Sequence, residues 1–508
     1  MAQRAVSISL RLTSGAAALL VVVLTLGTLA TVGWRAVPRG GLSAADLSAI
    51  RFTVWQAVLS AVFSIALAIP TARALARRKF PGRGVLVTLL GAPFLLPVIV
   101  AVLGLLAVFG RGGILNTAFG QFGIDPVSIY GLWGVVLAHV FFNLPLATRL
   151  ILQGWVEIPS ERFRLAATLN APVFSLLEWP MLRRVVPGIF LVVFLICLTS
   201  FAVALTLGGG PRATTVELAI YQAVRFDFDL GRAALLSCVQ FGLCAIAAFL
   251  AFRVPLTEGF GVGLDRVVPR WDGRVWLDVC VLVLVTLFLL LPLTIILLRG
   301  LPALLTLPSE VWPAAWRSVW VAGLATGLTI LLALAMALRG GRVMQGIGVL
   351  PLAASPLVVG TGLFLMIYPF ASPPRFALAV TIMVNAALAL PFALRALSPA
   401  VATVESDYGR LADQLNLTCW LRLRLVILPR IRRPLGFAAG LAAALSMGDL
   451  GVIALFATED QATLPLVMYR LMGSYRMEAA AAAGLLLVAL SLGAFWICDR
   501  GGRMNADA

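Results

Sequence analysis

Long apolar stretches separated by short polar segments dominate the chain. Twelve of them are long enough for a helix that crosses a hydrocarbon core about 30 Å thick, which needs about 20 residues. These windows are residues 12–34, 52–72, 84–110, 126–148, 185–211, 233–252, 279–298, 318–338, 343–374, 376–394, 434–456 and 479–498. Their apolar residues are continuous, whereas the strands of an outer-membrane barrel alternate apolar and polar residues. The pattern therefore predicts an all-α membrane protein with about 12 transmembrane helices.

Composition agrees with a membrane protein and explains the basic charge. Apolar residues make up 61% of the chain and charged residues 12%, which is far from the composition of soluble domains. The net charge of +17 could suggest nucleic acid, but no basic cluster with aromatic residues marks a soluble binding face. If the amino terminus is cytoplasmic, most basic residues fall in cytoplasmic segments. This positive-inside bias predicts a bacterial inner-membrane protein in contact with lipid, with both termini in the cytoplasm and no nucleic-acid partner.

No pattern of catalytic or metal-binding residues stands out. His139 is the only histidine, with no second histidine or carboxylate nearby, so it offers neither a metal site nor a catalytic dyad. The cysteines show no C-x-x-C spacing and are interpreted as small apolar residues. No phosphate-binding loop of the form G-x-x-x-x-G-K-[ST] occurs, and Lys79 is the only lysine. We expect a protein that is not an enzyme and that binds no cofactor itself.

The two halves of the chain repeat each other. A shift of 246 residues pairs Pro145 with Pro391, Arg149 with Arg395, Glu161 with Asp407, Arg164 with Arg410, Ala166 with Ala412 and Asn170 with Asn416. After a gap the shift becomes 249, and it then pairs Pro180, Arg183 and Arg184 with Pro429, Arg432 and Arg433. This repeat predicts a first unit at residues 1–252, a cytoplasmic linker at 253–278 and a second unit at 279–508. Because each unit has an even number of spans, the two should be related by a pseudo-two-fold axis along the membrane normal.

The repeat is centred on a cytoplasmic segment between the fourth and fifth spans of each unit, residues 160–177 and 406–425. Each segment is predicted to be helical with an apolar face, and in the first copy Phe163, Ala166, Ala167 and Asn170 fall at helical spacing. Asn170 and Asn416 fall where such a helix has to turn sharply, because Asn tolerates the left-handed conformation better than most residues.

The placement, the repetition and the downstream proline of these segments resemble the coupling loop, or EAA motif, of importer-type ABC transporter permeases. That motif has E-A-A, three residues, Gly, and a Pro thirteen residues after the Gly. The matching positions in the second copy are Arg410, Leu411, Ala412, Asn416 and Pro429, and in the first copy Arg164, Leu165, Ala166, Asn170 and, after only ten residues, Pro180. Both copies depart from the motif, since Arg replaces its Glu and Asn replaces its Gly.

Within this family, four stretches resemble the fused twelve-helix permeases of the thiamine ABC importer: residues 137–153, 178–187, 207–223 and 445–476. The resemblance implies two tandem six-helix units of the type I importer (MetI-like) fold that move thiamine and its phosphates into the cytoplasm. Iron(III) importer permeases share the fused architecture and are the nearest alternative. From another class, an ion-coupled secondary transporter would also have two six-helix halves, but such carriers usually hold charged residues near the midplane. Few occur here.

The resemblance also implies the partners and the residues that contact them. Two copies of a cytoplasmic ATPase subunit, which bind ATP and Mg, would receive the coupling loops, and a periplasmic or lipid-anchored binding protein would deliver the substrate. The implied coupling residues are Glu161, Arg164, Ala166, Ala167 and Asn170 in the first loop, and Asp407, Arg410, Ala412 and Asn416 in the second. Arg183, Arg184, Arg432 and Arg433 stand at membrane entry points, where contact with anionic headgroups is the alternative to ATPase contact.

Three polar residues in the predicted spans are candidates for the transport pathway. Asp449 lies about 16 residues into the eleventh window, where it could favour a cationic substrate or cap a helix break at residues 448–451. Asn143 and Asn385 could line the pathway or form hydrogen bonds between helices. The loop after Gly208, with Glu217, Asp227 and Asp229 downstream, could be a solvated turn or a contact for the binding protein.

Overall fold

All the described elements of the protein are helices. The structure, a computed structural model, describes residues 2–36, 41–91, 96–208, 210, 213–254, 267 and 275–503. Most of the predicted linker, residues 255–266 and 268–274, lies outside the described residues, as do Gly209, Pro211 and Arg212 of the predicted loop.

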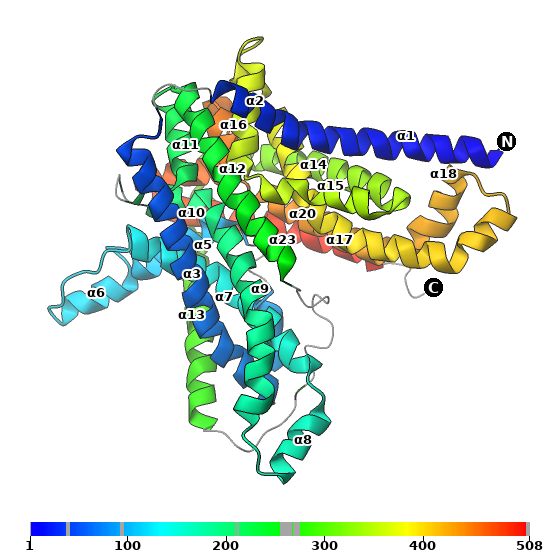
Figure 1. The fold of residues 1–508 in the computed structure, drawn as a ribbon. Helices are drawn as coiled ribbons and strands as arrows, with labels where there is room; N and C mark the ends of the chain where they lie inside the picture. Colours follow the sequence, from blue (N-terminus) through cyan, green and yellow to red (C-terminus); the bar gives the residue numbers. More distant parts are fainter. Residues whose placement is uncertain are drawn as a thin grey trace.

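Figure 1 shows the helices in chain order. Those of the first unit are α1 (Ala2–Val22), a π-helical turn (Val23–Gly27), α2 (Thr28–Arg35), α3 (Ala44–Arg77), α4 (Arg83–Leu89), α5 (Val98–Phe109), α6 (Ile114–Gln121), α7 (Leu132–Glu157), α8 (Ser160–Thr168), a π-helical turn (Phe174–Glu178), α9 (Trp179–Leu198), α10 (Phe201–Leu207), α11 (Val216–Arg225) and α12 (Leu230–Arg253). Those of the second unit are α13 (Val275–Ala303), α14 (Val311–Arg339), α15 (Arg342–Ala353), α16 (Pro356–Ile367), α17 (Ala377–Gln414), α18 (Cys419–Leu421), a π-helical turn (Arg422–Ile427), α19 (Leu428–Arg430), α20 (Arg432–Met447), α21 (Gly451–Phe456), α22 (Leu464–Gly473) and α23 (Met477–Arg503). Short 3-10 turns lie at Leu304–Thr306, Pro373–Phe376 and Glu459–Gln461.

The number of spans agrees with the sequence, but several spans are broken. Eleven helices in the described part are long and apolar enough to cross a membrane, and α15 with α16, bent by 85°, makes twelve when counted as one span. The windows at residues 84–110, 185–211 and 343–374, each predicted as one span, are interrupted, and the eleventh window breaks at residues 448–451, as one alternative for Asp449 had it. Pro97 precedes α5 and Pro356 begins α16. A proline ring disfavours helix in the residue before it, so the preceding helix has to end there.

Each unit gives its first helix to the bundle of the other. One apolar core is built from α3, α7 and α9 and also contains Leu282, Val285 and Leu289 of α13. A second core is built from α14 and α17 and also contains Ala17, Ala18 and Val21 of α1. The sequence units are therefore not separate packing bodies, because the first span of each lies against the helices of its partner.

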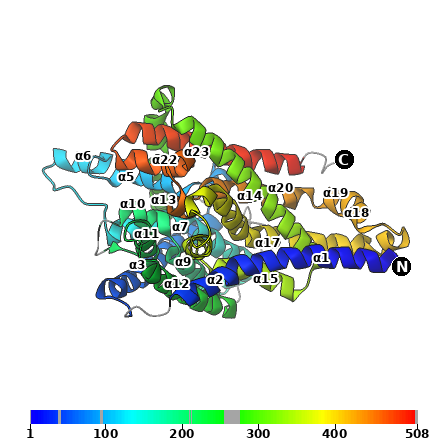
Figure 2. The ribbon, with the colours of Figure 1, turned by 90° about the horizontal axis from the view of Figure 1, so that it is seen from above.

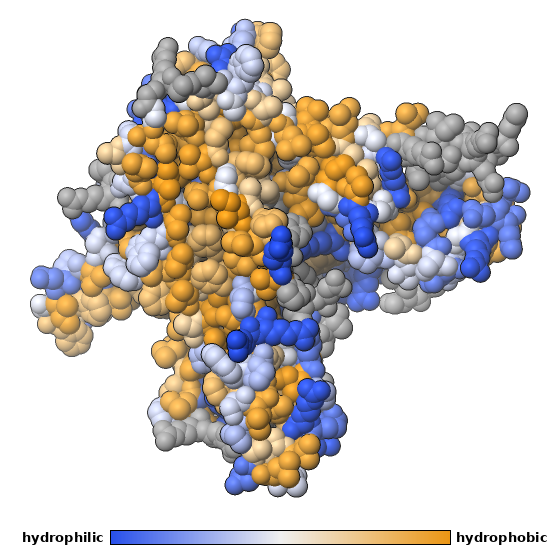
Figure 3. All heavy atoms as spheres, viewed as in Figure 1, coloured by the Kyte–Doolittle hydropathy of each residue, from blue (hydrophilic) through white to orange (hydrophobic). Residues whose placement is uncertain are grey.

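Two long arms extend from a common centre (Figure 1). One arm carries α8 at its tip, and the other, formed largely by α17, carries α18 and α19. The start of α1 and the end of α23 lie toward the end of the molecule reached by the α17 arm (Figures 1 and 2). The third apolar core, which takes helices from both units, joins them at the centre. In the surface view the central helices are largely apolar, and hydrophilic side chains gather toward the arms (Figure 3).

Two glycines allow a close approach of α20 and α23. A methyl group on Gly436 would lie 2.5 Å from the carbonyl oxygen of Cys498, and one on Gly440 would lie 2.9 Å from that of Phe495. Small residues four apart are a common means of close helix packing in membranes. A methyl on Gly493, also in α23, would meet nothing within 4 Å.

Gly436→Ala is therefore expected to destabilise the protein, and Gly493→Ala is not. The first substitution forces two backbones apart, an overpacking that costs about 1–3 kcal/mol. The second improves helix propensity by up to about 1 kcal/mol. The midpoint of thermal unfolding in detergent should fall for Gly436→Ala and stay level or rise for Gly493→Ala. Equal midpoints for the two variants would contradict the close packing.

Candidate functional site

The first cytoplasmic segment forms a separate short helix at the tip of its arm. α7 ends at Glu157, and the extended backbone of Ile158 and Pro159 redirects the chain before α8 begins. Phe163 and Ala166 are buried against the arm, as the apolar pattern predicted. Ala167, which we placed on the same face, is exposed. The helix therefore shows its remaining surface to solvent.

The second segment is the continuation of a membrane helix. α17 runs without a break from Ala377 to Gln414, whereas we expected a separate helix beginning at Ser406. At the shift of 246, Glu405 stands where the first copy has Pro159, so nothing interrupts the helix here. Gly409 and Ala412 are its buried residues in this region, at the positions of Phe163 and Ala166.

Both segments end in the same turn, as the sequence predicted. Asn170 has a φ of 48° and Asn416 a φ of 49°, both in the left-handed region. In the first copy the N–H of Ala171 donates to the carbonyl of Ala166 at 2.8 Å, and in the second that of Leu417 donates to Ala412 at 3.1 Å. These bonds satisfy carbonyls at the helix end and form the Schellman type of helix termination. The two asparagines thus reverse the chain in the same way.

The turns are fixed to their arms by different charged contacts. In the first copy Arg73 of α3 forms an ion pair with buried Glu178 at 2.9 Å and lies over the ring of Phe174. In the second copy Arg422 forms ion pairs with Glu405 and with Asp413.

The charge of Arg422 is secured by these partners. Burial alone would lower the pKa of this guanidinium, but the carboxylates of Glu405 and Asp413 raise it above its ordinary value. Arg422 therefore stays charged at any physiological pH and can keep both ion pairs.

The charged coupling candidates all lie on the exposed surface of these tips. Glu161, Arg164, Asp407 and Arg410 are exposed. One local contact is repeated, because the hydroxyl of Ser160 donates to Glu161 at 2.9 Å and that of Ser406 donates to Asp407 at 3.1 Å. The geometry leaves the two arginines available to a partner, and their role remains a prediction.

The sequence interpretation missed four exposed leucines at the arm tips. We call them the tip leucines: Leu165, Leu169, Leu411 and Leu415, with exposed fractions of 60%, 67%, 52% and 62%. They are paired by the same shift of 246, and within each copy they stand four residues apart on one side of the helix. Exposed apolar residues that recur at the tips of both arms indicate a surface for another protein. The alignment of the two repeats already pairs these leucines. The sequence interpretation had considered only the apolar residues that pack against the arm itself.

Asn143 and Asn385 make contacts typical of packing between helices. Asn143 Nδ2 donates to the carbonyl of His139 at 2.9 Å and approaches Cys197 of α9. Asn385 Nδ2 donates to the hydroxyl of Ser446 in α20 at 2.9 Å. The contact of Asn143 with Cys197 and that of Asn385 with Ser446 each join the fourth span of a unit to its fifth. They agree with the alternative that these asparagines form hydrogen bonds between helices. A part in the pathway remains a prediction.

Asp449 lies in the helix break that was one of its two predicted roles, whereas Glu217 does not lie in a solvated turn. α20 ends at Met447, so Asp449 stands in a break before α21, and its Oδ1 accepts from the N–H of Gly451 at 3.2 Å. Glu217, expected near a solvated turn, is fully buried in the first turn of α11. Most of α11 is buried, so the helix is inserted into the protein and does not lie on its surface.

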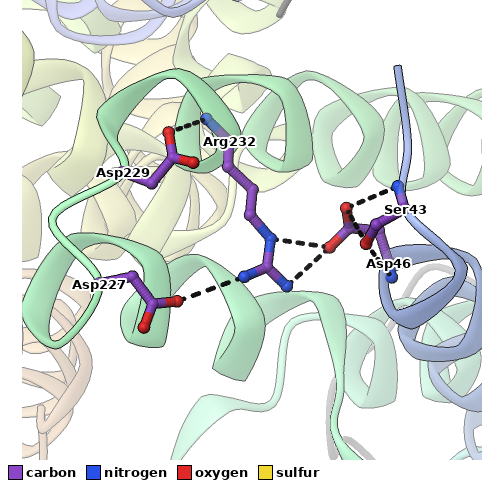
Figure 4. A network of polar contacts seen from close by, with 5 residues as sticks. All are labelled: Ser43, Asp46, Asp227, Asp229 and Arg232. Atoms are coloured by element: carbon purple, nitrogen blue, oxygen red, sulfur yellow. Dashed lines mark hydrogen bonds and ion pairs between the residues drawn. The ribbon is translucent and has the colours of Figure 1, made fainter. Parts of the chain in front are cut away.

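Asp227 and Asp229 belong to a network of polar contacts with Arg232, Ser43 and Asp46 (Figure 4). Arg232 of α12 contacts Asp227 at 3.3 Å and buried Asp46 of α3 at 2.9 Å, and its backbone N–H donates to Asp229. Ser43 and Asp46 cap the start of α3 reciprocally. The network ties α3 to α12 near the contact between the units.

Known proteins resemble this chain over nearly its whole length. The thiamine transport system permease protein of Brucella abortus is 41% identical over 484 residues, covering 90% of this chain and 88% of its own. The corresponding protein of Escherichia coli is 39% identical over 473 residues, covering 89% and 88%. That of Haemophilus influenzae is 36% identical, covering 86% of each chain. No protein-family profile matches the chain. With these identities over the full fold, the chain belongs to the family of thiamine transport system permease proteins, the membrane subunits of ABC importers.

Proposed function

We propose that this protein carries thiamine and its phosphates across the bacterial inner membrane into the cytoplasm, as the permease subunit of an ATP-driven importer. The observation that carries the proposal is the identity of 36–41% with thiamine transport permeases over nearly the full length. It favours thiamine over iron(III), the alternative that architecture alone leaves open. The repeated tips of the two arms support an importer with an external motor over an ion-coupled carrier.

The arms are the proposed contact with the motor. One copy of a cytoplasmic ATPase subunit would bind each tip, with ATP and Mg held by the ATPase and no cofactor held by this chain. The tip leucines, flanked by exposed Arg164 and Arg410, have the character of a helix that inserts into a groove. Both termini would then be cytoplasmic, which is supported by the start of α1 and the end of α23 lying toward the end reached by the α17 arm.

Movement would follow from the unequal affinity of the ATPase pair for two membrane arrangements. ATP binding draws the two ATPase subunits together, and each tip follows its subunit because the turn is fixed to the arm. α1 and α13 cross between the bundles, so they keep the units together while the arms swing. A soluble binding protein would deliver the substrate at the opposite end.

Transport can be tested in proteoliposomes that contain the permease, its ATPase subunit and the binding protein. We expect uptake of radiolabelled thiamine that requires ATP, is blocked by vanadate and is unaffected by excess ferric ion. Uptake by the permease alone on a proton or sodium gradient would instead show a secondary transporter. ATP-dependent uptake of iron without uptake of thiamine would establish the alternative cargo.

A further inference from the structure

Three breaks in membrane helices meet at the contact between the units. A methyl group on Gly448, in the break between α20 and α21, would lie 3.2 Å from Cα of Pro97, where α5 begins. A methyl on Gly451 would lie 3.7 Å from Cβ of Pro356, where α16 begins. Transporters commonly form substrate sites from such discontinuous helices, because the breaks free backbone groups in a buried place.

Two carboxyl groups border this junction, one from each unit. Glu217 is fully buried, and its Oε1 accepts from Gln240 Nε2 at 2.9 Å. The hydroxyl of Ser355, immediately before α16, lies near the same carboxyl, but Oε2 has no hydrogen-bond partner among the described residues. The Asp449 carboxyl interacts with the backbone N–H groups of Gly451, Val452 and Ile453 at the start of α21, but its buried Oδ2 has no hydrogen-bond partner in the described part of the chain.

These two carboxyls differ from the other buried ones in having no positive partner. Asp46, Glu178 and Asp278 each form an ion pair with an arginine. In the described part of the chain, neither Glu217 nor Asp449 forms an ion pair. A buried carboxylate without a counter-charge or a full set of hydrogen bonds is costly.

The shared fold does not require acids at these positions. Thr215 and Thr463 are the residues before α11 and α22, so Glu217 corresponds to Pro465 of the second unit. At the shift of 249, Asp449 corresponds to Ser200 of the first. Each unit thus folds with a neutral residue where the other has its carboxyl.

We propose that Glu217 and Asp449 form a cation-recognition site at this junction, which takes a flat organic cation as it passes between the units. The inference rests on the proposed function, because thiamine carries a thiazolium of this class. The cation supplies the missing positive partner, and the free Oε2 and Oδ2 are the atoms that meet it. In the present arrangement the junction is packed shut, so the site becomes accessible when the units separate.

The site can be tested by the binding of thiamine to the purified permease–ATPase complex without the binding protein. We compare wild type with Glu217→Gln and Asp449→Asn, which preserve shape and remove charge, and with Glu459→Gln, which removes an exposed carboxyl elsewhere. A second probe is a thiamine analogue in which a neutral thiophene replaces the thiazolium. We expect each site variant to weaken thiamine binding by about tenfold or more, with Glu459→Gln unchanged. The neutral analogue should bind wild type and site variants equally weakly.

Other outcomes would overturn the site. Unchanged binding of thiamine to both site variants would overturn the site. An equal loss of binding for thiamine and for the neutral analogue would also overturn it, because that result would show a structural role for the two carboxyls. Basal ATPase activity and the unfolding midpoint, measured on the same samples, identify misfolded variants. If wild type binds no thiamine here but the complete system still imports it, the site fails and the proposed function stands. If the complete wild-type system imports no thiamine, the proposed function fails first.

Discussion

Aspartate at the four tip leucines is expected to release the ATPase subunits and stop transport. The leucines are exposed apolar residues that recur at both arm tips. An apolar anchor in a protein interface contributes about 2 kcal/mol, and a carboxylate in its place must also be desolvated. Two substitutions in one tip therefore lower the affinity for an ATPase subunit by about 1,000-fold or more. Co-purification of the ATPase and ATP-dependent uptake measure the effect.

Methionine at the same four positions is the matched control. Methionine has nearly the volume of leucine and keeps an apolar surface, so binding should change little. Aspartate variants that keep the ATPase bound and transport normally would show that the tip leucines face only solvent or lipid. Changing one tip at a time should leave one ATPase subunit attached, which would show that each arm holds its own copy.

Loss of the Asp278 carboxylate is expected to destabilise the assembly of the two units strongly. Asp278, in the first turn of α13, accepts from Arg77 Nε at 2.9 Å and from Arg78 Nε at 2.7 Å. Asp278 and Arg77 have side chains that are only 6% and 9% exposed. Asp278→Asn removes the counter-charge that buried Arg77 contacts, and breaking a buried pair in this way costs about 3–5 kcal/mol. The midpoint of thermal unfolding in detergent should fall by several degrees.

The pair of Asp499 and Arg503 offers a control with the same chemistry on the surface. Arg503 is 60% exposed and contacts Asp499 at 2.8 Å, four residues earlier in α23. Asp499 is 17% exposed, but an ion pair between residues four apart on a helix contributes only about 0.3–0.5 kcal/mol, so Asp499→Asn should hardly move the midpoint. Combining Asp278→Asn with Arg77→Gln should recover part of the loss by removing one unpaired charge. If Asp278→Asn leaves the midpoint of thermal unfolding unchanged, the contacts of Asp278 with Arg77 and Arg78 do not hold α13 in the bundle of the first unit.

Much of the coupling region was predictable because its determinants are local. The left-handed turns at Asn170 and Asn416 follow from the side chain and its place after a helical segment, and both were confirmed. The form of the second segment was also in the sequence, since only the first copy has Pro159 before it. The tip leucines were visible in the repeat, but deciding which apolar residues face the arm and which face outward required the packed structure.

The membrane interior was harder to interpret. Apolar windows mark where a helix can cross lipid but say little about where it breaks, because Pro97 and Pro356 are compatible with either a kink or an interruption. Glu217 lies in a short helix that was not predicted, because the residues around it have the composition of a loop. Its burial became evident only once α11 was seen packed among the other helices.

By itself the sequence determined the class of protein, the number of spans to within one, the internal repeat and the helical segments that end at Asn170 and Asn416, because these depend on transfer into lipid and on local backbone preference. The tertiary structure decided which bundle α1 and α13 join, where the helices break and which carboxyls are left without a positive partner. The sequence of a helix that is apolar on all sides does not indicate which helices it packs against. The partners of a buried charge are known only from the folded chain, because they can be 200 positions away, as Arg78 is from Asp278.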